Sequence, residues 1–253
     1  MLYNKLYITR VTYRIKYRED CMEKWNFKKK IFVFLLSIII IITGGCKGKM
    51  TVNNEKLEIV QKEKWTEVGK DIFVFTSTYY RTNMTLIVSE KEAILIDTGM
   101  YDAECQNVMD FIKERNVKIK TIIITHDHND HIANIEKFKT DGVVVITPDN
   151  AKENQIVSIG DKNLKIMFTE GHYKPHAHIS MEIENQSILI AGDIIDNDYT
   201  ASAVAPGGDE KKLVETLKMF KDKNYKTVIP GHGDVGGSEL IVQHLEYFSE
   251  KIK

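Results

Sequence analysis

Short apolar runs separated by polar turns follow one another from residue 72 to residue 229. These runs predict β-strands at 72–76, 85–89, 93–97, 121–125, 143–147, 165–168, 179–183, 188–191 and 226–229. The first three form a predicted meander, with a charged turn at 90–92. Helical periodicity predicts α-helices at 101–115, 130–139, 211–221 and 239–251. Helices between runs of strands favour an α+β fold in which helices cover two packed sheets.

The first 46 residues follow a different pattern. Lys28 to Lys30 precede an apolar run at 31–42, which ends in small residues. That order is typical of a secretory signal, and a run of 12 residues is shorter than the roughly 18 that a membrane span needs. We therefore predict that residues 1–46 are a signal segment that exports the rest of the chain. Residues 1–21 fit no part of a signal, so translation starting at Met22 is an alternative.

The signal ends at Thr43-Gly44-Gly45-Cys46. Small residues before a cysteine resemble a bacterial lipobox, whose cysteine is acylated. Thr43 departs from that pattern, since an aliphatic residue is usual there. We predict lipidation of Cys46 and a membrane-anchored protein on the extracytoplasmic face; a cleaved soluble form and an uncleaved anchor are the alternatives.

Composition indicates the domain organisation and the kind of partner that the chain binds. Residues 47–64 are polar and predict a tether, followed by one folded domain at 65–253. Lys and Arg number 35 against 36 Asp and Glu, so no net field recruits nucleic acid, and we expect a small-molecule substrate instead. The spacing of the three cysteines predicts no disulfide, and Cys105 is expected to be a small buried apolar side chain in a helix.

Potential metal ligands are concentrated where the strand at 121–125 ends. His126 and His128 stand at i and i+2, so both side chains can point the same way and chelate one ion. Asp130 and His131 follow at the turn into the next helix and can face a neighbouring ion. A polar loop with solvated histidines is the alternative, but the density of ligand-type residues makes a chance match rare.

Further residues of the same kind come after other predicted strands. His172 follows Gly171, Asp193 follows Gly192, and His232 lies in a Pro-Gly-His-Gly turn.

This series of motifs resembles the metallo-β-lactamase superfamily, across about residues 68–253. The resemblance implies an αββα sandwich with two metal ions at one edge. It also implies their ligands: His126, His128 and His172 for the first ion, Asp130, His131 and His232 for the second, and Asp193 for both. The stretch 94–99 resembles a family strand whose Asp, here Asp97, holds a ligand histidine in the correct tautomer; a simple turn residue is the alternative.

Imidazole and carboxylate ligands suit zinc, although iron and manganese also accept them. Two such ions can hold a bridging hydroxide at neutral pH, so no protein nucleophile is needed. Asp130 is the predicted catalytic residue, because it can orient that hydroxide.

One motif departs from the family. The usual Thr-Pro-Gly-His-Thr-Pro-Gly-His is replaced by residues 169–178, which contain two extra residues. His172 is the predicted ligand, with His176 as the substitute, and we expect His178 to lie at the site edge or to pack in a strand. We expect His244 to be solvated or half-buried. Tyr173 and Tyr199 are candidate substrate contacts.

We predict an exported hydrolase with two zinc ions, acting on an ester, lactone, amide or phosphodiester. A zinc β-lactamase is the first alternative, favoured by export and by the stretch 227–236. Against it, Asp193 stands where that subclass has Cys, and Asp196 stands where it has a Lys that binds the antibiotic's carboxylate. Glyoxalase II acts on a cytosolic thioester, which export argues against, and the flavodiiron relatives have Glu where His128 stands. An inactive metal-binding surface protein is the second alternative, disfavoured because every ligand position is filled.

Overall fold

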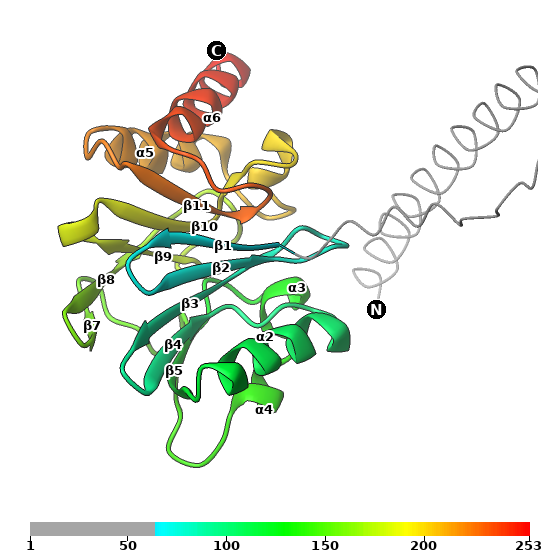
Figure 1. Ribbon diagram of the computed structural model, residues 1–253. Coiled ribbons are helices and arrows are strands. Elements are labelled where there is room, and N and C mark those ends of the chain that lie inside the picture. Colours follow the sequence, from blue (N-terminus) through cyan, green and yellow to red (C-terminus); the bar gives the residue numbers. More distant parts are fainter. Residues whose placement is uncertain (1–63) are drawn as a thin grey trace, which may run out of the picture. The chain divides into compact units, whose positions relative to one another are not determined.

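The computed structural model describes residues 64–253 as two sheets with helices outside them (Figure 1). The first sheet has the strand order β1-β2-β3-β4-β5-β6. Its strands are β1 (Lys64–Gly69), β2 (Ile72–Thr76), β3 (Asn83–Ser89), β4 (Glu92–Ile96), β5 (Lys118–Ile123) and β6 (Val144–Ile146). Strands β1 to β4 are antiparallel, which confirms the predicted meander, whereas β4, β5 and β6 run parallel.

The second sheet has the order β11-β10-β9-β8-β7. Its strands are β7 (Ile156–Ile159), β8 (Lys162–Phe168), β9 (Ile179–Ile183), β10 (Ile188–Asp196) and β11 (Thr227–His232). Strands β10 and β11 are parallel, and the other pairs are antiparallel. The remaining elements are α2 (Asp102–Glu114), α3 (Asn129–Ile132), α4 (Ile135–Phe138), α5 (Glu210–Lys221), α6 (Ser238–Lys251) and the short 3-10 helices η1 (Glu184–Gln186) and η2 (Thr200–Ala203).

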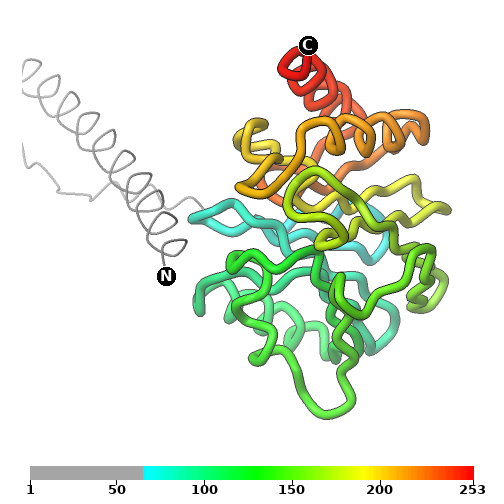
Figure 2. Tube along the Cα trace, turned by 180° about the vertical axis from the view of Figure 1, so that it is seen from behind, coloured from blue at the N-terminus to red at the C-terminus, as the bar shows by residue number. Residues whose placement is uncertain are grey.

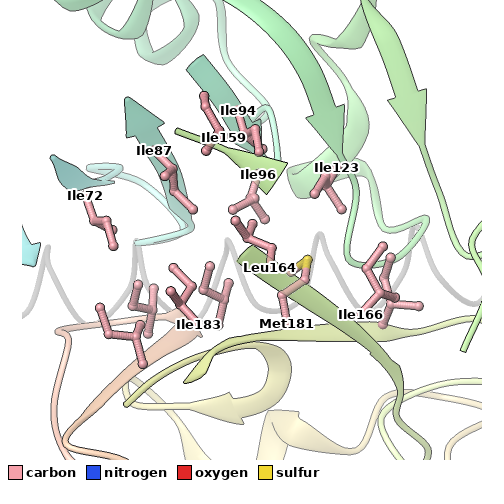
Figure 3. Close-up of a cluster of buried hydrophobic side chains, with 14 of the residues drawn as sticks. Ile72, Ile87, Ile94, Ile96, Ile123, Ile159, Leu164, Ile166, Met181 and Ile183 are labelled. Atoms are coloured by element: carbon pink, nitrogen blue, oxygen red, sulfur yellow. The ribbon is translucent and has the colours of Figure 1, made fainter. Parts of the chain in front are cut away.

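The core follows from the alternation of side chains along the strands. Ile94 and Ile96 of β4 meet Ile166 and Met181 of the second sheet in the interior between the sheets (Figure 3). Leu95, between the two isoleucines, points to the opposite face and packs against α2. Each fully buried aliphatic side chain contributes about 1.5–3 kcal/mol, so this pattern defines both faces of the sheet.

The second sheet is covered in the same way. Ile188 and Ile190 of β10 lie in the interior, while Leu189 and Ala191 pack with the apolar residues of α5 and α6. Figure 1 shows α5 and α6 on one side of the strands and α2, α3 and α4 on the other, and the view from behind shows the red end of the chain, with α6, and the green segment on opposite sides (Figure 2). Helices therefore flank both sheets.

Most predicted elements are present, with several corrections. The predicted helix 130–139 is two short helices, because Asn134 leaves the helical pattern and binds Thr98: its backbone N–H donates to Thr98 Oγ1 (3.3 Å) and its Nδ2 to Thr98 O (3.1 Å). Strands β1 and β7 were not predicted, and β10 continues to Asp196. Cys105 is fully buried in α2, as predicted.

Several predictions concern residues 1–63, which lie outside the described residues. They include the signal segment, the start at Met22, lipidation of Cys46 and nearly all of the tether. Between residues 64 and 253, no helix is long and apolar enough to cross a membrane.

Candidate metal centre

The candidate site lies where several strands end. His126 follows β5, Asp193 lies near the end of β10, and His232 is the last residue of β11. His172 lies in the loop after β8, a strand that runs parallel to β10 because both are antiparallel to β9. In each sheet the carboxyl ends of parallel strands meet at one edge, and the bridge between His126 and His178 joins the two sheets there, so residues up to 106 positions apart converge.

The structure brings all seven predicted ligands into two groups. In each group the potential ligand atoms lie within 4.8 Å of one another. The groups consist of His126, His128, His172 and Asp193, and of Asp130, His131 and His232.

Asp193, a member of the first group, also faces two histidines of the second group. Its Oδ2 is 3.6 Å from His126 Nε2, 3.5 Å from His172 Nε2 and 3.3 Å from His232 Nε2. Its Oδ1 is 3.2 Å from His131 Nε2. Asp193 Oδ1 is nevertheless a buried oxygen without a hydrogen-bond partner in the part of the chain that the structure describes. An unpaired buried oxygen is costly unless a cation or proton compensates it.

Asp97 and Thr125 hold the rings of His131 and His126 by hydrogen bonds to Nδ1, the ring nitrogen that faces away from the ligand groups. The Nδ1–H of His131 donates to Asp97 Oδ2 (2.8 Å), and Asp97 also accepts the Thr125 backbone N–H (2.8 Å) and hydroxyl (2.9 Å). Because the Thr125 hydroxyl donates to Asp97, its oxygen accepts the Nδ1–H of His126 (3.0 Å). Asp97 adopts a left-handed φ of 58°, a strained conformation typical of functional sites.

Two backbone carbonyls hold the next two histidines. His172 Nδ1–H donates to Ala203 O (3.2 Å), and His232 Nδ1–H donates to Tyr80 O (2.8 Å). Carbonyl and carboxylate oxygens only accept, so the proton of each neutral ring lies on Nδ1. The Nε2 lone pairs of His126, His131, His172 and His232 therefore point into the cluster.

The electrostatics of the two groups differ. Burial lowers the pKa of His126 and His128, and lowers the pKa of His172 to about 4. Burial would also lower the pKa of His232, but Asp193 outweighs it and raises the pKa to about 9. His131 behaves like His232, because Asp193 and Asp97 outweigh burial and hold its pKa well above the usual value.

This donor set fits bound metal. His128 Nδ1 lies 2.9 Å from His126 Nε2 and 3.2 Å from His172 Nε2, and these ring nitrogens face a carboxylate. His128 Nδ1 carries at most one proton and can donate to only one of the two rings. At least one unprotonated Nε2 therefore still faces the Asp193 carboxylate at 3.5–3.6 Å, and positive charge between them would stabilise that arrangement. Imidazole and carboxylate groups are ligands that zinc accepts.

Two residues that the sequence did not reveal shape the loop carrying His232. Asn83 Nδ2 donates to Pro230 O (2.8 Å) and Gly233 O (2.9 Å), and the Thr76 hydroxyl donates to Asn83 Oδ1 (2.7 Å). The sequence marks Asn83 only as a polar residue directly before the apolar run that begins at Met84. Gly231 permits the close approach of Asp193, because a Cβ there would lie 1.8 Å from Asp193 Oδ1.

The three histidines outside the two ligand groups differ in exposure and in their contacts. His176 is exposed and faces Glu170 (Nδ1 to Oε1, 3.8 Å), so His172 and not its substitute joins the cluster. His178 is buried directly before β9 and pairs with His126 in an isolated antiparallel bridge. The prediction that His244 is solvated or half-buried is wrong: it is 1% exposed and accepts the Asp196 backbone N–H (3.1 Å).

The expected role of Asp196 also changes. Its carboxylate accepts the backbone N–H groups of Asp198 (2.9 Å) and Tyr199 (2.8 Å) and the Ser202 hydroxyl. Asp196 therefore holds the turn at 198–202, a structural role that its place in the sequence did not predict. Of the two candidate substrate contacts, the ring of Tyr173 lies 4.7 Å from that of His128, and Tyr199 is 60% exposed.

Comparison with known proteins identifies relatives of this fold. Residues 78–152 and 140–232 match the family model described as the metallo-beta-lactamase superfamily. A hydroxyacylglutathione hydrolase of Francisella philomiragia is 30% identical over 154 residues, 56% of this chain and 59% of that protein. A type 2 metallo-beta-lactamase of Bacteroides fragilis is 27% identical over 180 residues, 63% of this chain and 72% of that protein.

A solved structure agrees. A metallo-beta-lactamase from Pontibacter korlensis superposes with a TM-score of 0.64 at 21% identity, covering 74% of this chain and 99% of that one. This likeness confirms the predicted αββα sandwich.

Proposed function

Since this chain belongs to the metallo-beta-lactamase superfamily, we propose that it is a zinc-dependent hydrolase with a two-ion centre. One observation carries the proposal: six His and Asp side chains converge in two groups around Asp193, whose buried Oδ1 has no hydrogen-bond partner among residues 64–253. His126, His128 and His172 would hold one ion, and Asp130, His131 and His232 the other, with Asp193 shared. Iron or manganese would fit the same ligands.

Bound zinc would supply Lewis acidity and a nucleophile at neutral pH. The chain's own residues prepare the site for it. Asp97 and the carbonyls of Ala203 and Tyr80 fix the rings so that Nε2 faces inward. Asp130 Oδ2 lies 3.4 Å from His232 Nε2, and the Asp130 side chain is 22% exposed. It can therefore also orient an attacking water and accept its proton, the catalytic role we propose for it.

The proposed substrates are small esters, lactones, amides or phosphodiesters. The hydroxyacylglutathione hydrolase relative favours acyl compounds, although this chain spans only 59% of its length. β-Lactam hydrolysis is the second candidate, and the relative from Bacteroides fragilis favours it. Asp193 remains the argument against that candidate, since the resembling β-lactamases have Cys at this position.

The purified full-length protein should contain close to two zinc ions by elemental analysis. Its turnover should be measured on chromogenic ester, lactone, thioester, phosphodiester and β-lactam compounds. We expect ester or lactone hydrolysis that a chelator abolishes and zinc restores. Preferential hydrolysis of the β-lactam would support the second candidate, and full metal content without any turnover would support an inactive binding protein.

We further propose that the protein is exported and anchored to the membrane through acylated Cys46. Residues 28–46 support this proposal by their basic, apolar and small-residue order. Labelled fatty acid should appear on the wild type but not on Cys46→Ser, and the wild type should fractionate with membranes. An unlabelled wild type would contradict lipidation.

A further inference from the structure

We infer that His178 is a positioning residue, which holds Asp193 and His126 in the arrangement that binds metal. The inference rests on the proposed metal-dependent function. His178 belongs to neither ligand group, so it would act through its neighbours.

The backbone of His178 joins the two sheets at the site. His178 directly precedes β9, and it forms an antiparallel bridge with His126, which follows β5. The neighbouring Ile179 N–H donates to Thr125 O (2.8 Å), and the Thr169 N–H donates to His178 O (3.1 Å). The His178 ring stacks on the His126 ring, with 5.1 Å between centroids and 28° between planes. Movement of His178 would therefore move a proposed ligand.

The side chain of His178 is held in one tautomer. Its Nε2 accepts the Asp193 backbone N–H (3.1 Å), so the ring proton lies on Nδ1 and donates to Thr169 Oγ1 (2.7 Å). The Thr169 hydroxyl can then donate to Ser180 Oγ (3.1 Å), and the Ser180 hydroxyl donates to Ala191 O (2.8 Å). The chain of hydrogen bonds thus starts and ends on β10, two residues apart.

The Asp193 N–H depends on this contact because the regular pairing with β9 ends at Ile190. Without His178 the N–H would be a buried donor without this partner, which costs roughly 1–3 kcal/mol. Gly192 makes the approach possible. A Cβ at Gly192 would lie 2.6 Å from His178 Nε2 and 3.0 Å from Thr125 Cβ, and Gly192 has a φ of +55°. Close contact with His178 and a positive φ therefore both require glycine at position 192.

The chain offers a matched control. His244 is also buried, and its Nε2 also accepts a backbone N–H of β10, that of Asp196. It lies on α6 and in neither ligand group. His178→Phe and His244→Phe therefore remove the same kind of hydrogen bond, three residues apart on one strand.

The experiment uses full-length protein with zinc, and with cobalt(II) as a spectroscopic probe of ligand geometry. We expect His178→Phe, which keeps a ring beside His126, to bind zinc roughly 10- to 100-fold more weakly, as loss of an outer partner does. Its cobalt spectrum should change. His178→Gln, which can accept the Asp193 N–H, should recover most of the affinity and the spectrum. His244→Phe should keep both, whatever its loss of thermal stability.

Wild-type zinc affinity and cobalt spectrum in folded His178→Phe would overturn the inference, as would equal losses in His244→Phe. If His178→Phe fails to fold, His178→Gln decides: binding no tighter than in a His178→Leu variant overturns the inference. A wild type that binds no metal would overturn the proposed function itself, and the inference with it.

Discussion

Two acidic side chains are buried in neighbouring strands of the second sheet, and their surroundings differ. Glu182 on β9 accepts Lys223 Nζ on both oxygens (2.8 Å each) and the Tyr225 hydroxyl (2.6 Å). Lys165 Nζ lies 3.5 Å away. Asp193 on β10 instead faces four imidazoles at 3.2–3.6 Å, and its Oδ1 has no hydrogen bond within the described region.

The difference shows which buried charge needs a partner from outside the chain. Burial alone would raise the pKa of Glu182, but its bonds to Lys223 and Tyr225 outweigh burial and lower it. Burial would likewise raise the pKa of Asp193, yet His232 and His131 hold it well below the usual value. Lysine stays charged whether or not a ligand is bound, whereas His131 and His232, whose raised pKa values keep them protonated without metal, must lose a proton to bind it. The charge of Glu182 is therefore balanced by side chains of the protein itself, whereas Asp193 is placed to bind a cation.

The largest expected effect comes from Asp193→Ala. We expect metal content to fall below two ions and kcat/KM to fall by more than about 100-fold, because losing even an outer partner costs 10- to 100-fold in metal sites. Elemental analysis and turnover of the best chromogenic substrate measure both. A variant with a single ion and unchanged turnover would contradict the shared-ligand arrangement.

The second largest effect is the fall in Tm when a chelator removes the metal, which should depend on Asp193 and not on Glu182. Zinc present at about 1,000 times its Kd stabilises the folded state by roughly 4 kcal/mol, so a chelator should lower the Tm of the wild type. Asp193→Ala should respond much less, while Glu182→Gln should keep the full chelator response. Thermal unfolding with and without chelator provides the measurement. An equal response in wild type and Asp193→Ala would remove the basis of the comparison.

Glu182→Gln should destabilise the fold by about 2 kcal/mol while leaving metal content unchanged. A broken buried ion pair costs roughly 3–5 kcal/mol, and the 38% exposure of Lys223 reduces this. Urea unfolding in the presence of zinc measures the loss. Glu184→Gln is the control, since Glu184 is 70% exposed and lies 4.0 Å from Lys165, and it should change stability little. Equal effects of the two substitutions would count against a special role for Glu182.

The smallest expected effect is the pH dependence of the stability lost in Glu182→Gln. The folded pKa of Glu182 lies below its unfolded value. Its ionised form therefore contributes stability above the unfolded pKa of about 4.3, and this contribution disappears as the pH falls through the folded pKa. The stability difference between wild type and Glu182→Gln should stay constant from pH 7 to 5 and shrink below about pH 4. Urea titrations of metal-free proteins test this, and a difference that grows with acidity would have the wrong sign.

The sequence by itself determined the ligand-type residues and most of the elements that carry them. His126 and His128 could be assigned to one side of a strand end because side-chain direction alternates locally along a strand. Ile94, Leu95 and Ile96 could be assigned to a strand by their run of apolar residues alone. Such inferences need only neighbours in the chain. The division of the ligand-type residues between two ions came instead from the resemblance to a family.

The tertiary structure alone decided how the polar side chains between these elements are used. Asp196 turns to the backbone at 198–199, His244 reaches back 48 positions to Asp196, and Asn83 binds a loop about 150 positions away. Strand β7, a sheet-edge strand of four residues whose Ile156 is exposed, is present only in the tertiary structure and was not predicted. A polar side chain can satisfy its hydrogen bonds in many ways, and only the packing of distant segments selects one.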